Sequence, residues 1–337
     1  MDKKVIQTII EEIGVNSPAV LATIVNVSGS VPRHEGAQML IFPDGRSVGT
    51  IGGGCGEAEV RREALIVLDD NKTKSYRVLL NSDLAADEGM VCGGIMDVLL
   101  EPLNHVHPYD FVLECLENIR PAVLVTQVSP ESKKGVYDIS GKKLAGEECK
   151  VDIKLLTEVY NKGTTSFVPD DNGHSVLYQP ILPEEKLLIL GAGHVGQYVA
   201  SFGKKLDFKV TVVDDRPDFA NPSRFPDADQ ILCSDFGQVL KDYKIDQSTY
   251  IVVVTRGHQY DEICLKNILG KPYKYLGMIG SRRRVKLLLT KLENEGYSVQ
   301  ELSRVKTPIG LKIGAETPAE IAISILGEII SVRRLQN

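Results

Sequence analysis

The sequence predicts an α/β protein with two domains, of which the second is a Rossmann-like parallel sheet. At 337 residues the chain is longer than one hydrophobic core usually supports. From Lys186 onward, short apolar strands alternate with helices, which is typical of a parallel sheet covered by helices. Because Pro180 and Pro183 interrupt the chain just before this alternation, we place the domain boundary there. We therefore expect a mixed α/β domain over 1–183 and a Rossmann-like domain over 184–337.

The composition is ordinary for a globular protein and argues against several kinds of partner. Hydrophobic residues make up 43% of the chain and charged residues 25%. The formal net charge of -6 gives no overall basic field, so we expect neither nucleic acid nor an anionic membrane as a partner. The longest apolar runs, at 187–190 and 251–254, are far shorter than the roughly 18 residues that a membrane-spanning helix needs.

The cysteines and the first residues of the chain both favour a cytoplasmic protein. Apolar residues from Val5 to Ile13 recur at helical spacing up to Gly14, which predicts an amphipathic helix rather than a signal peptide. Six cysteines lie at wide, irregular intervals without a CxxC pair. This spacing favours reduced thiols over a disulfide framework, and it offers no structural zinc site.

The N-terminal domain is predicted to mix strands and helices. After the first helix, strands are expected at 19–27, 38–42, 76–80, 95–100 and 122–128, and helices at 55–68 and 109–118. The stretch 129–179 is more polar, and we expect it to hold a hairpin and a short helix.

The C-terminal domain is predicted to alternate more regularly. Strands are expected at 187–190, 209–213, 251–255 and 275–279, and helices at 195–205, 261–269, 282–294 and 318–334. The sequence Thr317-Pro318-Ala319-Glu320 is a capping box that predicts the start of the last helix. Thr317 is the expected N-cap, and Glu320 occupies the third helical position.

A glycine pattern typical of nucleotide binding follows the first strand of the C-terminal domain. The pattern, Gly191-Ala192-Gly193-His194-Val195-Gly196, lies between a strand and a helix. In such a pattern Gly191 permits the tight turn, Gly193 lets the backbone approach a pyrophosphate, and Gly196 lets the helix pack on the strand. The N–H groups and the dipole of the helix N-terminus would hold the phosphates.

Other polar residues at the same edge of the predicted sheet are candidate ligand contacts. Asp214 ends the second strand about 20 residues further on, where a ribose-binding acid belongs. It favours a ligand with a free 2'-hydroxyl, although the adjacent Arg216 argues against this preference. His194, His258 and Asp261 follow strands at the edge where open α/β sheets bind ligands. A structural role for either histidine is equally compatible with the sequence.

A basic turn opens a later helix of the C-terminal domain. Ser281 is the expected N-cap of this helix, and Arg282, Arg283 and Arg284 follow it. Three arginines beside exposed helix N–H groups would form a local anion site, in which we include Ser281, Arg282 and Arg283. The alternative is a basic turn that is simply exposed to water.

Two loops of the N-terminal domain combine glycine with cysteine. The first, Gly52-Gly53-Gly54-Cys55, places a thiol at the start of a predicted helix, where the helix dipole favours the thiolate. The second is Cys92-Gly93-Gly94, and the turn Ser30-Val31-Pro32-Arg33 adds a cation at Arg33. Glycines often serve tight turns, and cysteines often pack as small apolar residues. Two such loops in one domain, together with Arg33, favour a ligand site.

Taken together, these motifs resemble those of the XdhC/CoxI family, the xanthine dehydrogenase accessory proteins. The resemblance spans both domains but not the polar middle region, and the motifs follow the family's order. They are Ser30-Val31-Pro32-Arg33 with Gly36-Ala37, Gly52-Gly53-Gly54-Cys55 with Glu57, Cys92-Gly93-Gly94, Gly191 to Gly196 with His194, Gly280-Ser281-Arg282-Arg283, and Pro308-Ile309-Gly310-Leu311-Lys312-Ile313-Gly314 with Thr317-Pro318. One position departs from the family pattern, since Gly56 stands where a larger residue, often valine, is expected.

The resemblance implies a maturation factor that acts as a cofactor-binding chaperone more than as an enzyme with its own turnover. Such proteins bind the molybdenum cofactor, shelter it while a terminal sulfur is installed with help from a cysteine desulfurase, and hand it to an apo-molybdenum hydroxylase. The cofactor would be molybdopterin or its dinucleotide form, and molybdenum would enter only within it. Cys55 and Cys92 are then candidates for a sulfur relay or a molybdenum contact. The oligomeric state stays open, and a homodimer is one alternative.

Two other functions stay open on the sequence alone. One is an NAD-dependent oxidoreductase, with NAD on the C-terminal domain and His194 or His258 as the general acid or base. That function leaves the two cysteine loops without a role. The other is a non-catalytic sensor that binds a nucleotide on the C-terminal domain. Bound pterin would favour the maturation factor, whereas hydride transfer with NADH would favour the oxidoreductase.

Overall fold

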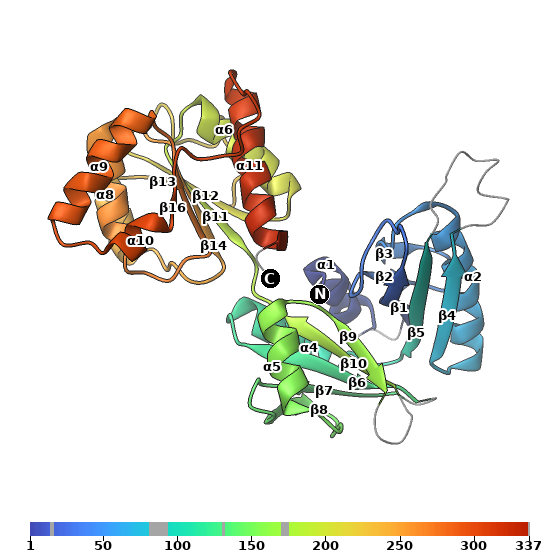
Figure 1. The fold of residues 1–337 in the computed structure, drawn as a ribbon. Helices are drawn as coiled ribbons and strands as arrows, with labels where there is room; N and C mark the ends of the chain where they lie inside the picture. The colour runs from blue at the N-terminus through green and yellow to red at the C-terminus, as the bar shows by residue number, and fades with distance from the viewer. Residues whose placement is uncertain (14–16, 81–93, 130–131, 170–174, 336–337) are drawn as a thin grey trace. The chain divides into compact units, whose positions relative to one another are not determined.

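The chain forms two compact units, Met1–Pro183 and Glu184–Asn337 (Figure 1). The computed structural model describes residues 1–13, 17–80, 94–129, 132–169 and 175–335. The first unit contains two antiparallel sheets with helices, and the second contains one parallel sheet with helices on both faces. The predicted α/β class, with a Rossmann-like parallel sheet in the C-terminal half, is confirmed.

The first sheet of the N-terminal unit is antiparallel, and α2 (Gly54–Asp70) covers one of its faces. Along the central strand β1, Val20, Ala22 and Ile24 face α2, while Leu21 faces the opposite side. Because β1 is buried on both faces, its sequence is almost continuously apolar. The strand order is β3-β2-β1-β5-β4, formed by Ser47–Gly49, Gln38–Ile41, Ala19–Ser28, Ile95–Leu103 and Lys74–Leu79.

The opposite face of this sheet packs against three helical segments near the middle of the unit. These are α1 (Lys3–Thr8), the π-helical turn η1 (Ile9–Ile13) and α4 (Tyr109–Glu117). Val5 and Ile9 are fully buried there. The amphipathic first helix predicted from the sequence is therefore confirmed, although its last turn is π-helical rather than α-helical.

A second antiparallel sheet completes the N-terminal unit, and α5 (Ile153–Lys162) covers its outer face. The strand order is β8-β7-β6-β10-β9, formed by Lys143–Gly146, Lys133–Tyr137, Ala122–Gln127, Ser175–Ile181 and Ser166–Pro169. The prediction of one hairpin and one short helix for the polar middle region was incomplete, because that region supplies β7 to β10. The edge strands β8 and β9 contain no buried residue, so they lack the apolar pattern that signals a strand.

The C-terminal unit is built on a six-stranded parallel sheet of order β13-β12-β11-β14-β15-β16. In this order the strands are Gln230–Cys233, Lys209–Asp214, Lys186–Leu190, Thr249–Val253, Tyr275–Met278 and Val305–Lys306. From β11 the chain adds strands on one side of the sheet (β12, β13) and then on the other (β14, β15, β16), although all strands are parallel. The boundary between β11 and β14 is therefore the switch point where open α/β sheets bind ligands. The sequence analysis did not predict β13, a four-residue strand in which no residue is fully buried.

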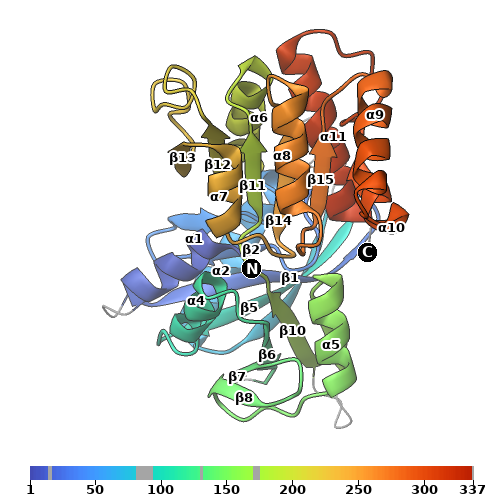
Figure 2. The same cartoon turned by 90° about the vertical axis from the view of Figure 1, so that its left-hand side faces the viewer.

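Helices cover both faces of the parallel sheet, and Figure 2 shows α7, α8 and α9 in front of it. One face carries α6 (His194–Lys205) and α11 (Pro318–Leu335), and the other carries α7 (Phe236–Asp242), α8 (His258–Ile268), α9 (Arg282–Asn294) and α10 (Val299–Ser303). The predicted capping box is confirmed, since the Thr317 N–H donates to the Glu320 carboxylate at 2.9 Å and the Glu320 N–H donates to the Thr317 hydroxyl at 3.3 Å. The predicted N-cap Ser281 is also confirmed.

Candidate functional site

Glu57, in the first turn of α2, organises the glycine loop that precedes this helix. Its Oε1 atom accepts hydrogen bonds from the Thr50 hydroxyl at 2.5 Å and from the backbone N–H groups of Ile51, Gly52 and Gly53 at 3.0, 3.2 and 2.9 Å. The positive end of the helix dipole also favours a carboxylate in the first turn. One side chain therefore holds the whole loop against the start of α2.

The charge of Glu57 is stabilised by these contacts. Burial by itself would raise the pKa of Glu57, but the hydrogen bonds from Thr50 and from the loop N–H groups outweigh it and lower the pKa. The second carboxylate oxygen accepts from Arg61 at 3.3 Å. The sequence analysis noted Glu57 as part of a motif but gave it no role. The signal that identifies it is an acid in the first turn of a helix that follows a glycine run.

The glycines of this loop have different surroundings. Gly52, Gly53 and Gly54 all have positive φ angles, of 136°, 80° and 65°, which favour glycine. A Cβ atom at Gly52 would lie 2.2 Å from the Pro32 ring, whereas one at Gly53 would meet no heavy atom within 4 Å. The backbone at Gly53 is thus the place where a ligand has room to approach.

The structure brings together three motifs that are far apart in the sequence. Pro32 packs against Gly52, as its distance to a Cβ atom there shows. On the other side of the same turn, a Cβ atom at Gly94 would lie 2.3 Å from the Ser30 carbonyl oxygen. The turn that leads to Arg33 therefore contacts both Gly52 and Gly94. Arg33 is exposed and has no hydrogen-bond or ion-pair partner in the described part of the chain.

Of the two cysteines predicted to act in this site, the structure describes Cys55 but not Cys92. Cys55 is exposed and lies in the first turn of α2. Cys92 lies outside the described residues, as does Gly93. Burial raises the pKa of the thiols of Cys115, Cys149 and Cys264, which makes them poor nucleophiles.

Gly56, which departs from the family pattern, is buried inside the unit. A Cβ atom at this position would lie 3.2 Å from the Leu80 side chain and 3.5 Å from the Val78 side chain. A methyl group at this position would thus contact Val78 normally and would require only a small shift of the Leu80 side chain. The loop before Gly56 is held separately, by the hydrogen bonds from Thr50, Ile51, Gly52 and Gly53 to the Glu57 carboxylate.

In the C-terminal unit, the glycine pattern forms a tight turn at the switch point of the sheet. Gly191 has a φ angle of 123°, and a Cβ atom there would lie 2.4 Å from the Val254 carbonyl oxygen at the end of β14. A Cβ atom at Gly196 would lie 2.1 Å from the Gly191 carbonyl oxygen, so α6 packs closely on this turn. At Gly193 a Cβ atom would meet nothing within 4 Å. His194, the first residue of α6, is exposed.

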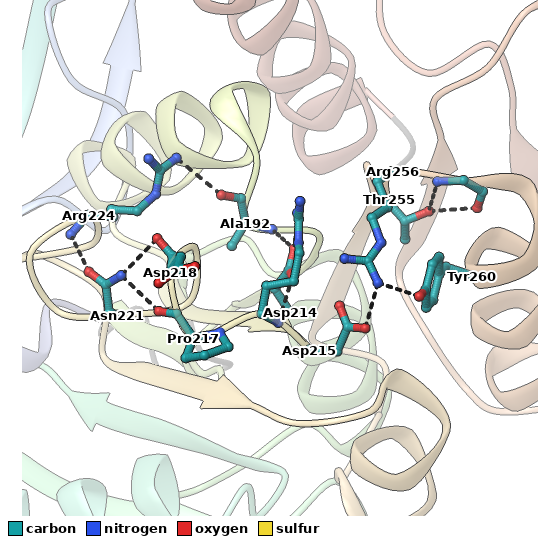
Figure 3. Close-up of polar contacts among 12 residues, drawn as sticks. Ala192, Asp214, Asp215, Pro217, Asp218, Asn221, Arg224, Thr255, Arg256 and Tyr260 are labelled. Atoms are coloured by element: carbon teal, nitrogen blue, oxygen red, sulfur yellow. Dashed lines mark hydrogen bonds and ion pairs between the residues drawn. The ribbon is translucent and has the colours of Figure 1, made fainter.

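Asp214, at the end of β12, is 2% exposed and accepts four hydrogen bonds. Figure 3 shows it beside Ala192. Its Oδ2 atom accepts from the Ala192 N–H at 2.8 Å and from Arg216 Nη2 at 2.9 Å. Its Oδ1 atom accepts from the N–H and the Nε of Arg216, at 3.1 and 2.8 Å. Burial raises the pKa of Asp214, but these hydrogen bonds outweigh burial and lower it below its usual value.

Asp261 is buried at the start of α8 and joins three elements of the C-terminal unit. Its Oδ1 atom accepts from the Thr255 hydroxyl at 2.5 Å, and its Oδ2 atom pairs with Arg284 of α9. Burial raises the pKa of Asp261, and the contacts with Thr255 and Arg284 offset this effect only in part. His258, the first residue of α8, is exposed. The sequence analysis did not include Arg284 in the site.

Arg282 and Arg283 lie on other sides of α9 than Arg284, because successive helical residues are rotated by about 100°. Arg282 lines a groove of about 510 Å³ between α9, α10 and Pro308. Arg283 lines a second groove, of about 580 Å³, along the outer side of α9. Of the three arginines in this turn, Arg284 is the one that reaches Asp261.

The described ranges contain no group of three or more His, Cys, Asp or Glu residues that could hold a metal ion. In the same ranges, no helix has both the length and the apolar character needed to cross a membrane. The glycine motifs singled out by the sequence lie in two places: the glycine–cysteine loop with its neighbouring turn in the N-terminal unit, and the turn at the switch point of the sheet in the C-terminal unit.

These two sites define a two-domain α/β protein with a glycine–cysteine loop in one unit and a Rossmann-type crevice in the other. Comparison with known proteins shows that the chain belongs to the XdhC and CoxI family. The model described as "XdhC and CoxI family" matches residues 14–79, and the model described as "XdhC Rossmann domain" matches residues 187–329. The resemblance inferred from the motifs is confirmed.

Individual relatives match almost the whole chain. A Bacillus subtilis (strain 168) protein, named as a probable subunit of xanthine dehydrogenase, is 31% identical over 322 residues, which cover 94% of this chain and 93% of that protein. The Escherichia coli (strain K12) "Molybdenum cofactor insertion chaperone PaoD" is 28% identical over 318 residues, which cover 94% of this chain and 83% of that protein. A crystal structure from Bacillus halodurans, described as a xanthine dehydrogenase, is 27% identical with a TM-score of 0.81, and covers 100% of this chain and 97% of that one.

Proposed function

We propose that this protein is a maturation factor that binds the molybdenum cofactor, supports its sulfuration and delivers it to an apo-molybdenum hydroxylase such as xanthine dehydrogenase. It would act as a cofactor-binding chaperone, and the cofactor would be its cargo. Membership of the XdhC and CoxI family supports a maturation role. The relative named as a molybdenum cofactor insertion chaperone supports the identity of the cargo.

The observation that carries this proposal is that the turn at Ser30-Val31-Pro32 contacts both Gly52 and Gly94. These contacts bring Gly52 and Gly94 to the turn that leads to the exposed Arg33, and the exposed Cys55 follows Gly52 by three positions in the chain. A loop that served only to reverse the chain would need neither the exposed thiol nor the open space beside Gly53. The arrangement supports a wall of a ligand site.

The residues of this wall suit the chemistry of a molybdopterin. Such a cofactor carries a metal held by dithiolene sulfurs, a flat hydrogen-bonding pterin and a phosphate. The open backbone at Gly53 would admit a flat ring, and the thiol of Cys55 would contact the metal end or pass on sulfur, since soft thiolates suit such centres. Arg33 would face an anionic group of the cargo. Cys92 and Gly93 would complete the same wall.

The C-terminal crevice would hold the phosphate end of a ligand. The open backbone at Gly193 lies at the N-terminus of α6, where helix N–H groups and the helix dipole attract anions. His194 and His258 begin α6 and α8 beside this crevice, and both side chains are exposed. Arg282, in the groove between α9, α10 and Pro308, and Arg283, on the outer side of α9, add positive charge to this unit.

The proposed partners follow from this role. They are the apo-molybdenum hydroxylase that receives the cofactor and a cysteine desulfurase that supplies the sulfur, in the cytoplasm, with a homodimer as one form of the factor itself. We do not propose the NAD-dependent oxidoreductase. Both oxygens of Asp214 are already hydrogen-bonded, and that function would leave the exposed Cys55 without a role.

The proposal is tested by purifying the wild type and the variants Cys55→Ala and Cys92→Ala from a molybdate-fed, cofactor-competent host. Bound molybdopterin and the sulfur transferred to it are then measured by mass spectrometry. We expect Cys55→Ala to lower at least one of the two values. Cys233→Ala is the matched control, because Cys233 is an exposed cysteine of the C-terminal unit. Unchanged values in both Cys55→Ala and Cys92→Ala would remove cysteine from the mechanism.

A further inference from the structure

The Asp214 carboxylate has no remaining capacity to bind a ribose. An ionised carboxylate offers about four lone-pair sites on its two oxygens. In this structure Asp214 accepts four hydrogen bonds, one from Ala192 and three from Arg216. At 2% exposure it also lies below the surface that a ligand would contact. The Asp214 carboxylate therefore binds the Ala192 N–H and Arg216 of the protein itself and is not available to the two hydroxyl groups of a ribose.

Arg216 stands between this carboxylate and the solvent, and it keeps donors available. Its side chain is 27% exposed. Its Nε and Nη2 atoms each donate one hydrogen bond to Asp214, which leaves three of the five guanidinium N–H donors without a partner among the described residues. The guanidinium carbon lies 3.7 Å from the centre of the Phe219 ring, so the planar group is held in one orientation. It is a fixed, partly exposed donor surface.

Two further arginines flank Asp214, as Figure 3 shows. Arg256 donates from Nη2 to Asp215 at 2.8 Å and also contacts the Tyr260 hydroxyl. Arg224 donates to two neutral acceptors, the Ala192 carbonyl oxygen at 3.3 Å and Gln197 Oε1 at 3.4 Å. A ligand that enters this end of the crevice therefore meets guanidinium groups. Both oxygens of the Asp214 carboxylate are already hydrogen-bonded. Asp215 pairs with Arg256 through Oδ2, and its other oxygen is buried.

We propose that this end of the C-terminal crevice recognises a phosphomonoester rather than a ribose diol, and that Arg216 is the residue that determines this specificity. A phosphomonoester dianion accepts several charge-assisted hydrogen bonds, which matches the three available donors of Arg216. The group has two possible sources, the 2'-phosphate of an adenine nucleotide or the terminal phosphate of a pterin mononucleotide. This inference makes the binding role of the crevice more specific. If the source is the pterin mononucleotide, the inference rests on the proposed function.

The test is isothermal titration calorimetry on the full-length protein with three probes. These are ADP-ribose, ADP-ribose 2'-phosphate and 6-hydroxymethylpterin phosphate. We expect at least one of the two phosphomonoesters to bind about tenfold more tightly than ADP-ribose, the difference that one or two charge-assisted hydrogen bonds supply. The preference should shrink as salt is raised, because part of it is electrostatic. No molybdenum or sulfur is present, so a failure here is distinct from a failure of the cysteine experiment.

Variants of Arg216 test whether this residue causes the preference for phosphomonoesters over ADP-ribose. Arg216→Gln should abolish the preference, and Arg216→Lys, which keeps the charge but not the planar fork, should restore part of it. Arg304→Gln is the matched control, because it removes another guanidinium that stacks on an aromatic ring, that of Tyr273, and leaves the contacts between Arg216 and Asp214 in place. Equal binding of all three probes, no binding of any, or a preference that survives in Arg216→Gln would overturn the proposal. Circular dichroism of each variant checks that the protein is folded.

Discussion

The Nζ atom of Lys134 in β7 lies 2.6 Å from a carboxylate oxygen of Glu101 in β5, so one ion pair joins the two sheets of the N-terminal unit. The two side chains are 11% and 2% exposed. Lys134 also donates to the Thr126 hydroxyl at 3.2 Å. Burial by itself lowers the pKa of Lys134, but the carboxylate beside it outweighs this effect and raises the pKa. Lys134 therefore stays protonated at neutral pH.

We expect Lys134→Met to lower the free energy of unfolding by about 3 to 5 kcal/mol, because it leaves the buried Glu101 carboxylate without its cation. The double variant Lys134→Met with Glu101→Leu should recover most of this loss, since no buried charge remains. Urea unfolding followed by circular dichroism measures both values.

The control for this prediction is Lys74→Met, which removes a half-exposed lysine that pairs with Glu63 in the same unit. It should cost less than about 1 kcal/mol, as exposed ion pairs usually do. If the double variant were as unstable as Lys134→Met alone, the ion pair would not be the source of the loss.

Replacing Glu57 should show how the glycine loop depends on a carboxylate. We expect Glu57→Gln to destabilise the protein by about 2 kcal/mol at neutral pH, because a neutral amide oxygen accepts the four loop hydrogen bonds less strongly. The pKa of Glu57 in the folded protein lies below its usual 4.5, so the stabilising contribution is present above pH 4.5 and is lost as the pH falls through the folded value. The difference between wild type and variant should therefore shrink on acidification.

The measurement is urea unfolding of wild type and Glu57→Gln at a series of pH values. The exposed Glu117→Gln should change the unfolding free energy by less than about 0.5 kcal/mol throughout. A difference for Glu57→Gln that stays constant down to strongly acidic pH would show that its charge does not contribute.

Three glycines allow backbone strain to be separated from steric overlap. Gly45 and Gly53 have φ angles of 81° and 80° with no heavy atom near their Cβ positions, so alanine at either should cost about 1 kcal/mol of strain. Gly52→Ala should cost clearly more, because its methyl group would lie 2.2 Å from Pro32. Thermal unfolding gives this order. Only Gly53→Ala should also lower bound molybdopterin without a large loss of stability, and equal binding in Gly53→Ala and Gly45→Ala would contradict that role for Gly53.

Removing Arg284 should produce a stability loss that depends on pH. Arg284→Gln leaves Asp261 buried without its cation, and we expect a loss of about 3 kcal/mol at neutral pH. The pKa of Asp261 is already raised, so the folded state holds the proton more tightly than the unfolded state does. Acidification should therefore reduce the loss, because a protonated Asp261 needs no cation. Arg283→Gln, on the outer side of α9, should change stability little at any pH. A loss that grows on acidification would contradict this account.

Much of the C-terminal unit was predictable because its signals are local. The contacts of Thr317 with Glu320 join residues three positions apart, and the same is true of Ser281 and the N–H of Arg284. Strands β11 and β14 are buried on both faces and read as continuous apolar runs. By contrast, β13 and the strands of the polar middle region were missed, because edge strands carry few buried residues.

The choice of functional side chains was less predictable. All three arginines after Ser281 fit the sequence pattern of an anion site equally well, and the rotation of α9 against α8 decides that Arg284 reaches Asp261. Glu57 was visible as an acid in the first turn of a helix, but its role depends on the path of the preceding loop. That path is a matter of backbone angles at three glycines, which the sequence leaves open.

By itself, the sequence determined where most strands and helices form, the helix caps, and the glycine and cysteine motifs that identify the family. Each of these depends on residues that are neighbours in the chain. Tertiary structure alone decided which of these motifs meet. Gly94 packs on Ser30, and the Asp214 carboxylate accepts hydrogen bonds from the Ala192 N–H and from Arg216. Such contacts depend on strand register and on helix rotation, which are set by the burial of many side chains at once and not by any short segment.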